Sequence, residues 1–238
     1  MTKKMIVKVC GLRDGENIRQ VAALGIDWIG LIFCDRSPRN VTMIPTHAGI
    51  IPDRAPASSV PGGSPAGTPK RVGVFVDEMP QNIITRVVNF RLDLVQFHGH
   101  ETPTMIRNLR ATLDPDIRPG IQFIKAISVA TPADLAACKQ YEDCVDYFLF
   151  DTRATVPAGS PAGSPLPGGT GQHFDWSILS AYDGEKPFLL SGGIGPDDAP
   201  RIRTFQHPRC IGIDLNSKFE DEPALKNIQK LKTFLEQL

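Results

Sequence analysis

Eight short apolar runs recur along the chain, and they constrain its fold more than any other feature. They lack the polar–apolar alternation of half-exposed strands, which is typical of strands buried on both faces of a parallel sheet. The runs are Met5 to Cys10, Trp28 to Phe33, Arg71 to Val76, Leu92 to Phe97, Phe123 to Ile127, Tyr147 to Phe150, Phe188 to Leu190 and Cys210 to Leu215.

Helical patterns occupy several of the intervals between these runs. Asp14 to Leu24, for example, places its apolar residues on one face and stops at Gly25. Strands that alternate with helices over 238 residues predict one (β/α)₈ barrel covering residues 1–238, with a doubly wound open sheet as the alternative. The other expected helices are Thr102 to Leu109, Thr131 to Tyr141, Asp197 to Arg203 and Pro223 to Leu238.

Two segments rich in proline, glycine and serine interrupt the alternation, at about residues 45–69 and 154–167. Both contain Pro-Ala-Gly-(Ser/Thr)-Pro and carry too few apolar residues to pack, a composition typical of loops or disorder. We predict that they are loop insertions in one barrel, with linkers between domains as the alternative. The helix expected between Thr42 and Pro69 is therefore short or absent.

Charge and cysteine content narrow the functional classes. Lysine plus arginine equals aspartate plus glutamate at 26 each, so the chain has no electrostatic footprint for nucleic acid or for an anionic membrane. The 5 cysteines lack C-x-x-C spacing, and the start of the chain reads as neither a signal peptide nor a membrane span. These features predict a soluble cytoplasmic protein with reduced thiols.

Two groups that can move a proton stand at the ends of the first and sixth runs. Cys10 ends the first run, and Asp151 follows the sixth. In a barrel both strand ends lie on the rim that carries catalytic groups, and a thiolate base facing a carboxylic acid suits a proton-transfer isomerase. Taken singly, Cys10 is also explained as a small buried hydrophobic residue and Asp151 as a turn residue.

The ends of other strands supply candidate substrate ligands. Gly192 and Gly193 follow the seventh run, and Asn216 and Ser217 follow the eighth, where barrels bind phosphate through backbone N–H groups. Arg39 follows the second run, where it is placed to bind a substrate carboxylate. Tight turns and a solvated surface charge are the simpler explanations of these residues.

The segment from Gln96 to His100 raises the question of a metal. His98 and His100 fall on one side of an extended segment, but no third ligand follows at a recognisable spacing. We therefore expect neither a metal nor another cofactor.

Seven motifs occur in a recognisable order along the chain. They are Lys8-Val9-Cys10-Gly11-Leu12, Ser37-Pro38-Arg39, Val72-Gly73-Val74-Phe75-Val76, Leu94-Val95-Gln96-Phe97-His98-Gly99, Phe150-Asp151-Thr152, Gly168-Gly169-Thr170-Gly171 followed by Phe174-Asp175-Trp176, and Leu190-Ser191-Gly192-Gly193. In this order they resemble the motifs of phosphoribosylanthranilate isomerases, a family of (β/α)₈ barrels of tryptophan biosynthesis. The resemblance covers nearly the whole chain except the two insertions.

The resemblance implies an Amadori rearrangement of a phosphosugar, without cofactor or metal, and leaves other enzymes of the tryptophan pathway open as partners. It implies that Cys10 is the general base, Asp151 the general acid and Arg39 the ligand of the anthranilate carboxylate. For these roles the pKa of a thiol, ordinarily about 8.5, must fall, and that of a carboxyl, ordinarily about 4, must rise. The positions that match the family's phosphate-binding backbone are Gly192, Gly193, Asn216 and Ser217.

One departure and three rival functions remain at this point. Lys218 stands where the family often has glycine, so it is either strained or an added cation near the phosphate. The histidine-pathway isomerase of the same barrel class is expected to use two aspartates, and Cys10 argues against it. A flavin-binding barrel and a catalytically silent barrel that serves as a binding module are the second and third rivals.

Overall fold

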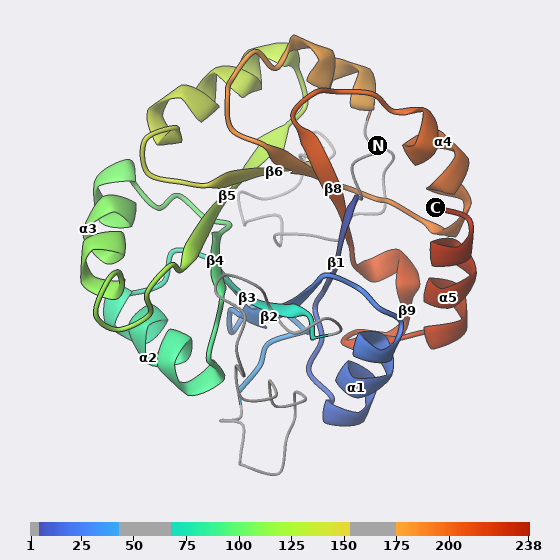
Figure 1. Cartoon of the computed structure of the whole chain (residues 1–238), viewed down its shortest axis with the longest axis horizontal. Coiled ribbons are helices and arrows are strands. Elements are labelled where there is room, and N and C mark those ends of the chain that lie inside the picture. Colours follow the sequence, from blue (N-terminus) through green and yellow to red (C-terminus); the bar gives the residue numbers. More distant parts are fainter. Residues whose placement is uncertain (1–4, 43–67, 153–174) are drawn as a thin grey trace, which may run out of the picture.

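The computed structural model describes residues 5–42, 68–152 and 175–238 and shows a closed barrel of eight parallel strands (Figure 1). The first strand pairs with both the second and the eighth, which confirms the predicted barrel and excludes the open sheet. The strands are β1 (Ile6–Cys10), β2 (Trp28–Phe33), β3 (Lys70–Phe75), β4 (Leu94–Phe97), β5 (Gln122–Val129), β6 (Tyr147–Thr152), β7 (Phe188–Leu190) and β8 (Cys210–Leu215).

The strands carry apolar side chains on both faces because each face meets a separate core. The larger core lies between the sheet and the surrounding helices, and a smaller one fills the inside of the barrel. Trp28 of β2 and Tyr147 of β6 meet edge to face there, with ring centroids 5.4 Å apart. This double burial explains why the runs in the sequence do not alternate. Buried members of the inner cluster are Cys10, Trp28, Val72, Val74, Leu94, Ile124, Ala126, Leu149, Leu189 and Ile211.

Helices form a ring around the barrel, and short polar side chains define where several of them begin (Figure 1). Asp14 accepts a hydrogen bond from the Asn17 backbone N–H, and Thr102 accepts one from Met105. The α-helices are α1 (Gly15–Ala23), α2 (Pro80–Phe90), α3 (Pro103–Leu113), α4 (Ala199–Thr204) and α5 (Ile228–Glu236). Segments of 3₁₀ helix are η1 (Pro132–Tyr141), η2 (Trp176–Ala181), η3 (Pro196–Asp198) and η4 (Ser217–Phe219).

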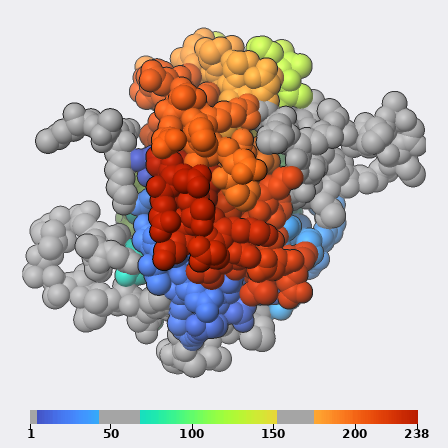
Figure 2. Space-filling model, turned by 90° about the vertical axis from the view of Figure 1, so that its right-hand side faces the viewer, coloured from blue at the N-terminus to red at the C-terminus, as the bar shows by residue number. Residues whose placement is uncertain are grey.

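The end of the chain differs from the prediction of one helix from Pro223 to Leu238. The chain first forms a hairpin of β9 (Glu220–Glu222) and β10 (Leu225–Lys226), and α5 begins only at Ile228. The helix starts there because the Asn227 side chain accepts a hydrogen bond from the Lys230 backbone N–H. Figure 2 shows α5 (dark red) packed between α1 (blue) and α4 (orange). Hydrogen bonds between Asn17 of α1 and Lys226 of β10 hold the hairpin against α1.

Other differences are smaller. The helix α2 was not among the expected helices, and the helix expected over Asp197 to Arg203 divides into η3 and α4. Most of both expected insertions, and the question of a helix between Thr42 and Pro69, lie outside the described residues. None of the helices in the described ranges is long and apolar enough to cross a bilayer.

Candidate active site

Cys10 is the last residue of β1, and its side chain belongs to the cluster inside the barrel. It is 3% exposed. A Cβ atom on Gly30 of β2 would lie 2.6 Å from Cys10 Sγ, so this glycine leaves the space that the thiol occupies. Lys8, two residues earlier on β1, is fully buried, and its Nζ lies 2.8 Å from Oδ1 of Asp214 on β8.

The neighbours of Cys10 act on its acidity in opposite directions. Burial raises the pKa of the Cys10 thiol, the ammonium groups of Lys8 and Lys226 lower it, and Asp214 raises it further. The balance is a raised pKa, which is the reverse of the predicted lowering. The two buried lysines thus offset part of the cost of forming a thiolate inside the barrel.

Asp151 lies within β6 rather than after it, because this strand continues to Thr152. Leu149, two residues earlier, belongs to the inner cluster, so the alternation of the strand places Asp151 on the inner face as well. Its Oδ2 lies 3.4 Å from Nε2 of His98, which follows β4. Nδ1 of His98 in turn lies 3.1 Å from Nε2 of the buried Gln96. The structure thus joins Asp151 to a histidine considered above only as a metal ligand.

A buried ion pair holds the backbone immediately after His98. Glu101 and Lys125 have side chains that are 2% and 3% exposed, and their charged atoms lie 3.0 Å apart. Glu101 accepts a hydrogen bond from the Gly99 N–H at 3.0 Å, and Lys125 donates one to the Gly99 carbonyl at 2.6 Å. Both backbone polar groups of Gly99 are therefore tied to the pair, which restricts where His98 can lie.

The turn after β7 has the backbone conformation that glycine favours. Gly192 and Gly193 have φ angles of +86° and +71°, so larger residues would be strained at either position. The hydroxyl of Ser191 lies 3.4 Å from Oδ2 of Asp214, which links this turn to the ion pair of Lys8. The turn thus adjoins β8, which is followed by Asn216 and by Ser217 at the start of η4.

Lys218 adopts no strained conformation at the position where the resemblance leads one to expect glycine. The non-glycine residues with positive φ in the described ranges are Asp77, Arg91 and Ala224. The Cβ and Cγ atoms of Lys218 lie 3.9 Å from the place that a Cβ on Gly195 would take. Of the two alternatives, strain is therefore wrong, and the lysine stem lies beside the turn after β7.

Arg39 is held at the rim by a buried acidic residue of the hairpin. Its Nε and Nη2 lie 2.9 Å from Oε1 and 2.6 Å from Oε2 of Glu220. Lys226 approaches the same carboxylate at 2.5 Å and also donates to Oδ1 of Asn216 at 2.9 Å. A Cβ atom on Gly11, whose φ is +80°, would lie 2.6 Å from Arg39 Cδ and 2.7 Å from Asn216 Oδ1. The residue after Cys10 must therefore be glycine for these side chains to pass over it.

An inward thiol at the end of β1, an inward carboxyl in β6 and a glycine turn after β7 are thus in place in the barrel. The family model described as N-(5'phosphoribosyl)anthranilate (PRA) isomerase matches residues 7–237. The chain belongs to this family. The isomerase of Parabacteroides distasonis is 45% identical over 234 residues, which cover 98% of this chain and 93% of that protein. The isomerase of Phocaeicola vulgatus is 40% identical over 234 residues and covers 98% of both chains.

Solved structures of phosphoribosylanthranilate isomerases share the fold. The enzyme of Thermotoga maritima superposes with a TM-score of 0.72 at 27% identity, covering 98% of both chains. Another member, solved in complex with reduced 1-(o-carboxyphenylamino)-1-deoxyribulose 5-phosphate, gives a TM-score of 0.70 at 25% identity, again over 98% of both chains. The barrel of this chain is thus that of the isomerase family.

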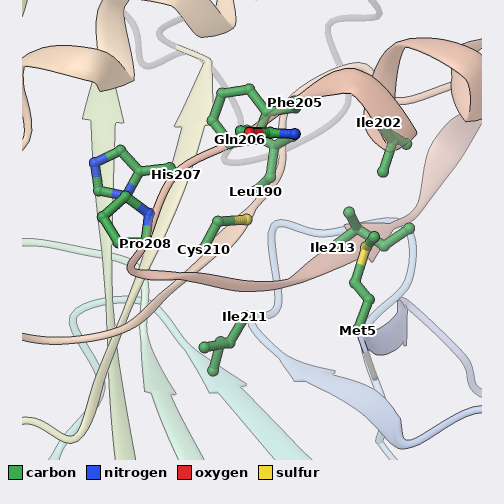
Figure 3. Close-up of a pocket in the computed structure, with 10 residues that line it drawn as sticks. All are labelled: Met5, Leu190, Ile202, Phe205, Gln206, His207, Pro208, Cys210, Ile211 and Ile213. Atoms are coloured by element: carbon green, nitrogen blue, oxygen red, sulfur yellow. The ribbon is translucent and has the colours of Figure 1, made fainter. Parts of the chain in front are cut away.

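A cavity of about 570 Å³ lies away from these residues of the family site (Figure 3). Met5, which precedes β1, and Cys210, at the start of β8, line it, so it reaches the ends of these strands opposite to Cys10. Its walls are mainly apolar, with His207 and Cys210 as the residues able to exchange a proton. We therefore place the site at the rim that carries Cys10 and not in this cavity.

The structure brings together Cys10, Arg39 and Asn216, and places Asp151 with His98 on the inner face of β6. Four further polar residues of the site were not predicted from the sequence. Two of them could have been found in the sequence, because His98 and Asp214 stand at or near the ends of predicted strands. Position at a strand end is the criterion that identified Asp151 as a candidate. Burial alone distinguishes the other two, and it is invisible in a sequence. The four residues are His98, Asp214, Glu220 and Lys226.

Proposed function

We propose that the chain catalyses the Amadori rearrangement of N-(5-phosphoribosyl)anthranilate to 1-(2-carboxyphenylamino)-1-deoxyribulose 5-phosphate in tryptophan biosynthesis. The observation that carries this proposal is Cys10, a buried thiol at the end of β1 whose acidity is increased by Lys8 and Lys226. It is also the residue that the resemblance matches to the family's general base. The activity resides in one domain covering residues 1–238. A cytoplasmic location and contacts with other enzymes of the pathway stay predictions.

In the proposed mechanism two groups move protons in turn. Asp151, as a carboxylic acid, donates a proton to the furanose ring oxygen as the bond from C1 to that oxygen breaks, which leaves an open-chain protonated imine (iminium). Cys10, as a thiolate, removes the proton from C2 to give an enolamine. The enolamine gains a proton at C1 and loses its C2 hydroxyl proton, so the product is a ketone isomeric with the substrate. Proton transfer of this kind contributes about 10²–10⁴ in rate for each group.

The substrate is bound at its two ends in this proposal. Arg39 binds the anthranilate carboxylate, because a guanidinium offers several N–H donors in one plane. The phosphate lies against backbone N–H groups after β7 and β8, where the glycine conformations leave the backbone open to a ligand. The residues proposed to bind phosphate are Gly192, Gly193, Asn216 and Ser217.

The test generates phosphoribosylanthranilate in situ from anthranilate, phosphoribosyl pyrophosphate and the preceding transferase, and follows the loss of its fluorescence. We expect rapid loss with the unmodified protein and a rate at least about a hundredfold lower with Cys10→Ser or Asp151→Ala. Cys210→Ser and the exposed Asp143→Ala are matched controls that retain the rate. A folded protein without turnover would contradict the isomerase activity, and full activity in Cys10→Ser would contradict the role of the thiol.

A further inference from the structure

We propose that Lys226 and Glu220 determine the specificity of this site for a substrate that carries a carboxylate, by setting the net charge and the orientation of Arg39. This inference deepens the proposed function and rests on it. It concerns three side chains that are nearly removed from solvent: Arg39 is 12%, Glu220 5% and Lys226 0% exposed.

The first part of the evidence is the direction from which Glu220 approaches Arg39. The carboxylate takes the edge of the guanidinium formed by Nε and Nη2. In the described part of the chain, no residue accepts a hydrogen bond from Nη1 of Arg39. A bidentate contact on one edge fixes the plane of the guanidinium and leaves its opposite end able to donate to a ligand.

The second part is the charge of the cluster. Arg39 and Glu220 alone would form a neutral pair with little attraction for an anion. Nζ of Lys226 lies between two acceptors, Glu220 Oε1 at 2.5 Å and Asn216 Oδ1 at 2.9 Å, an environment that suits an ammonium group. Burial lowers the pKa of Lys226 below its ordinary value, and the adjacent Glu220 carboxylate opposes this shift without cancelling it. With Lys226 charged, the three groups carry a net charge of +1, which is complementary to one carboxylate.

The third part is that the fold holds Lys226 in place through its backbone. The side-chain amide of Asn17 in α1 donates to the Lys226 carbonyl at 2.8 Å and accepts from the Lys226 N–H at 2.8 Å. Asn17 itself is 3% exposed. This pair of bonds fastens the hairpin of β9 and β10 to α1, so the ammonium group has little freedom to leave Glu220.

The experiment measures binding of two ligands and does not depend on turnover. One ligand is reduced 1-(o-carboxyphenylamino)-1-deoxyribulose 5-phosphate, and the other is its analogue with an unsubstituted phenyl ring. The ratio of their dissociation constants reports the contribution of the carboxylate. We expect the unmodified protein to prefer the carboxylated ligand by about tenfold or more, since charge-assisted hydrogen bonds contribute in this range.

Lys226→Met removes the charge and keeps most of the volume, so the cluster becomes neutral. We expect the preference to fall about tenfold, through weaker binding of the carboxylated ligand alone. In the double variant Glu220→Gln with Lys226→Met, the net charge returns to +1 and the introduced amide retains an acceptor for Arg39. We expect most of the preference to return, which loss of structure alone would not produce. Lys232→Met, at an exposed lysine of α5, is the control.

Three results would overturn the proposal: no preference in the unmodified protein, an unchanged preference in Lys226→Met, or a double variant no better than that single variant. If Lys226→Met does not fold, the ratio of dissociation constants is measured for Glu220→Gln instead. This variant raises the net charge of the three groups to +2, and we expect it to keep or increase the preference for the carboxylated ligand. A decrease would overturn the proposal. Absence of isomerase turnover is a separate result, because it contradicts the proposed reaction while this binding ratio remains measurable.

Discussion

The two sides of the barrel rim support their proton-transfer groups by different means. On the β1/β8 side, the charges of Lys8, Asp214 and Lys226 act directly on the thiol of Cys10. On the β4/β6 side, the buried pair of Glu101 and Lys125 holds the backbone after His98, and His98 contacts Asp151. Buried charge thus governs acidity on the first side and position on the second.

The largest expected effect is on stability and concerns the buried ion pair of Lys8 and Asp214 on the β1/β8 side. Lys8→Met leaves the carboxylate of Asp214, which is 7% exposed, without its ammonium partner. We expect the free energy of unfolding, measured in urea, to fall by about 3–5 kcal/mol. Asp214→Asn added to Lys8→Met removes both charges, and we expect it to recover most of the loss.

The control for Lys8→Met is an exposed ion pair. Arg107→Met breaks the contact with Asp143, whose side chain is 63% exposed, and we expect a loss below about 1 kcal/mol. Equal losses in Lys8→Met and Arg107→Met would show that the charges on the β1/β8 side are not held away from solvent, and the comparison of the two sides would fail.

The second effect is on the pH dependence of kcat/KM and concerns the β1/β8 side, where buried charges act on the pKa of Cys10. Because burial raises the pKa of Cys10, the thiolate becomes abundant only above the ordinary range of a thiol. The limb of kcat/KM that reports this base therefore rises with pH, by about tenfold for each unit below the thiol pKa. Lys226→Met removes a cation that lowers this pKa, so we expect the limb to move to higher pH.

Lys232→Met is again the control for the pH profile, since this lysine lies on the exposed surface of α5. We expect its profile to coincide with that of the unmodified protein. A limb that moves to lower pH in Lys226→Met would contradict the direct action of the buried charges on Cys10.

The third effect concerns position on the β4/β6 side. His98→Gln removes the imidazole that contacts Asp151 at 3.4 Å. We expect kcat to fall about tenfold with KM nearly unchanged, because the acid loses an orienting contact without loss of a substrate ligand. His100→Gln is a matched control on a side chain that is 97% exposed. A change in KM alone would instead place His98 among the substrate ligands.

On both sides of the rim, the sequence predicted the strands and the candidates at strand ends better than the charged residues whose role depends on burial. Eight apolar runs predicted eight strands because both faces of each strand are covered, and strand ends identified Cys10 and Asp151. The second strand of the hairpin, β10, was predicted as the beginning of a helix because Leu225 and Ile228 fit one apolar stripe. In the structure Leu225 is 36% exposed, and Asn227 begins the helix later.

The charges around Cys10 could not be predicted for a related reason. Lys226 and Glu220 are charged residues in a polar stretch, which is normally a solvated surface. Only the paired hydrogen bonds of Asn17, 209 positions away in the sequence, place Lys226 inside the molecule. Local patterns do not contain such long-range contacts, so the sequence did not reveal Lys226 as a cation that lowers the pKa of Cys10. Nor did it reveal the burial that outweighs both lysines and raises this pKa.

The smallest expected effect is on KM and concerns Lys218, whose exposed charge lies near the proposed phosphate-binding backbone. The stem of Lys218 lies beside Gly195 after β7, close to the backbone proposed to bind phosphate, and its side chain is exposed. Exposed charges contribute about 0–1 kcal/mol and are screened by salt, so we expect Lys218→Gly to raise KM by about two- to fivefold at low ionic strength. The difference should disappear near 1 M salt, where the screening length is about 3 Å. Lys232→Gly on α5 controls for loss of surface charge. An effect of Lys218→Gly that persists at high salt would mean that this lysine acts at short range, as the buried charges near Cys10 do. The contrast between surface charge and the buried charge of the β1/β8 side would then fail.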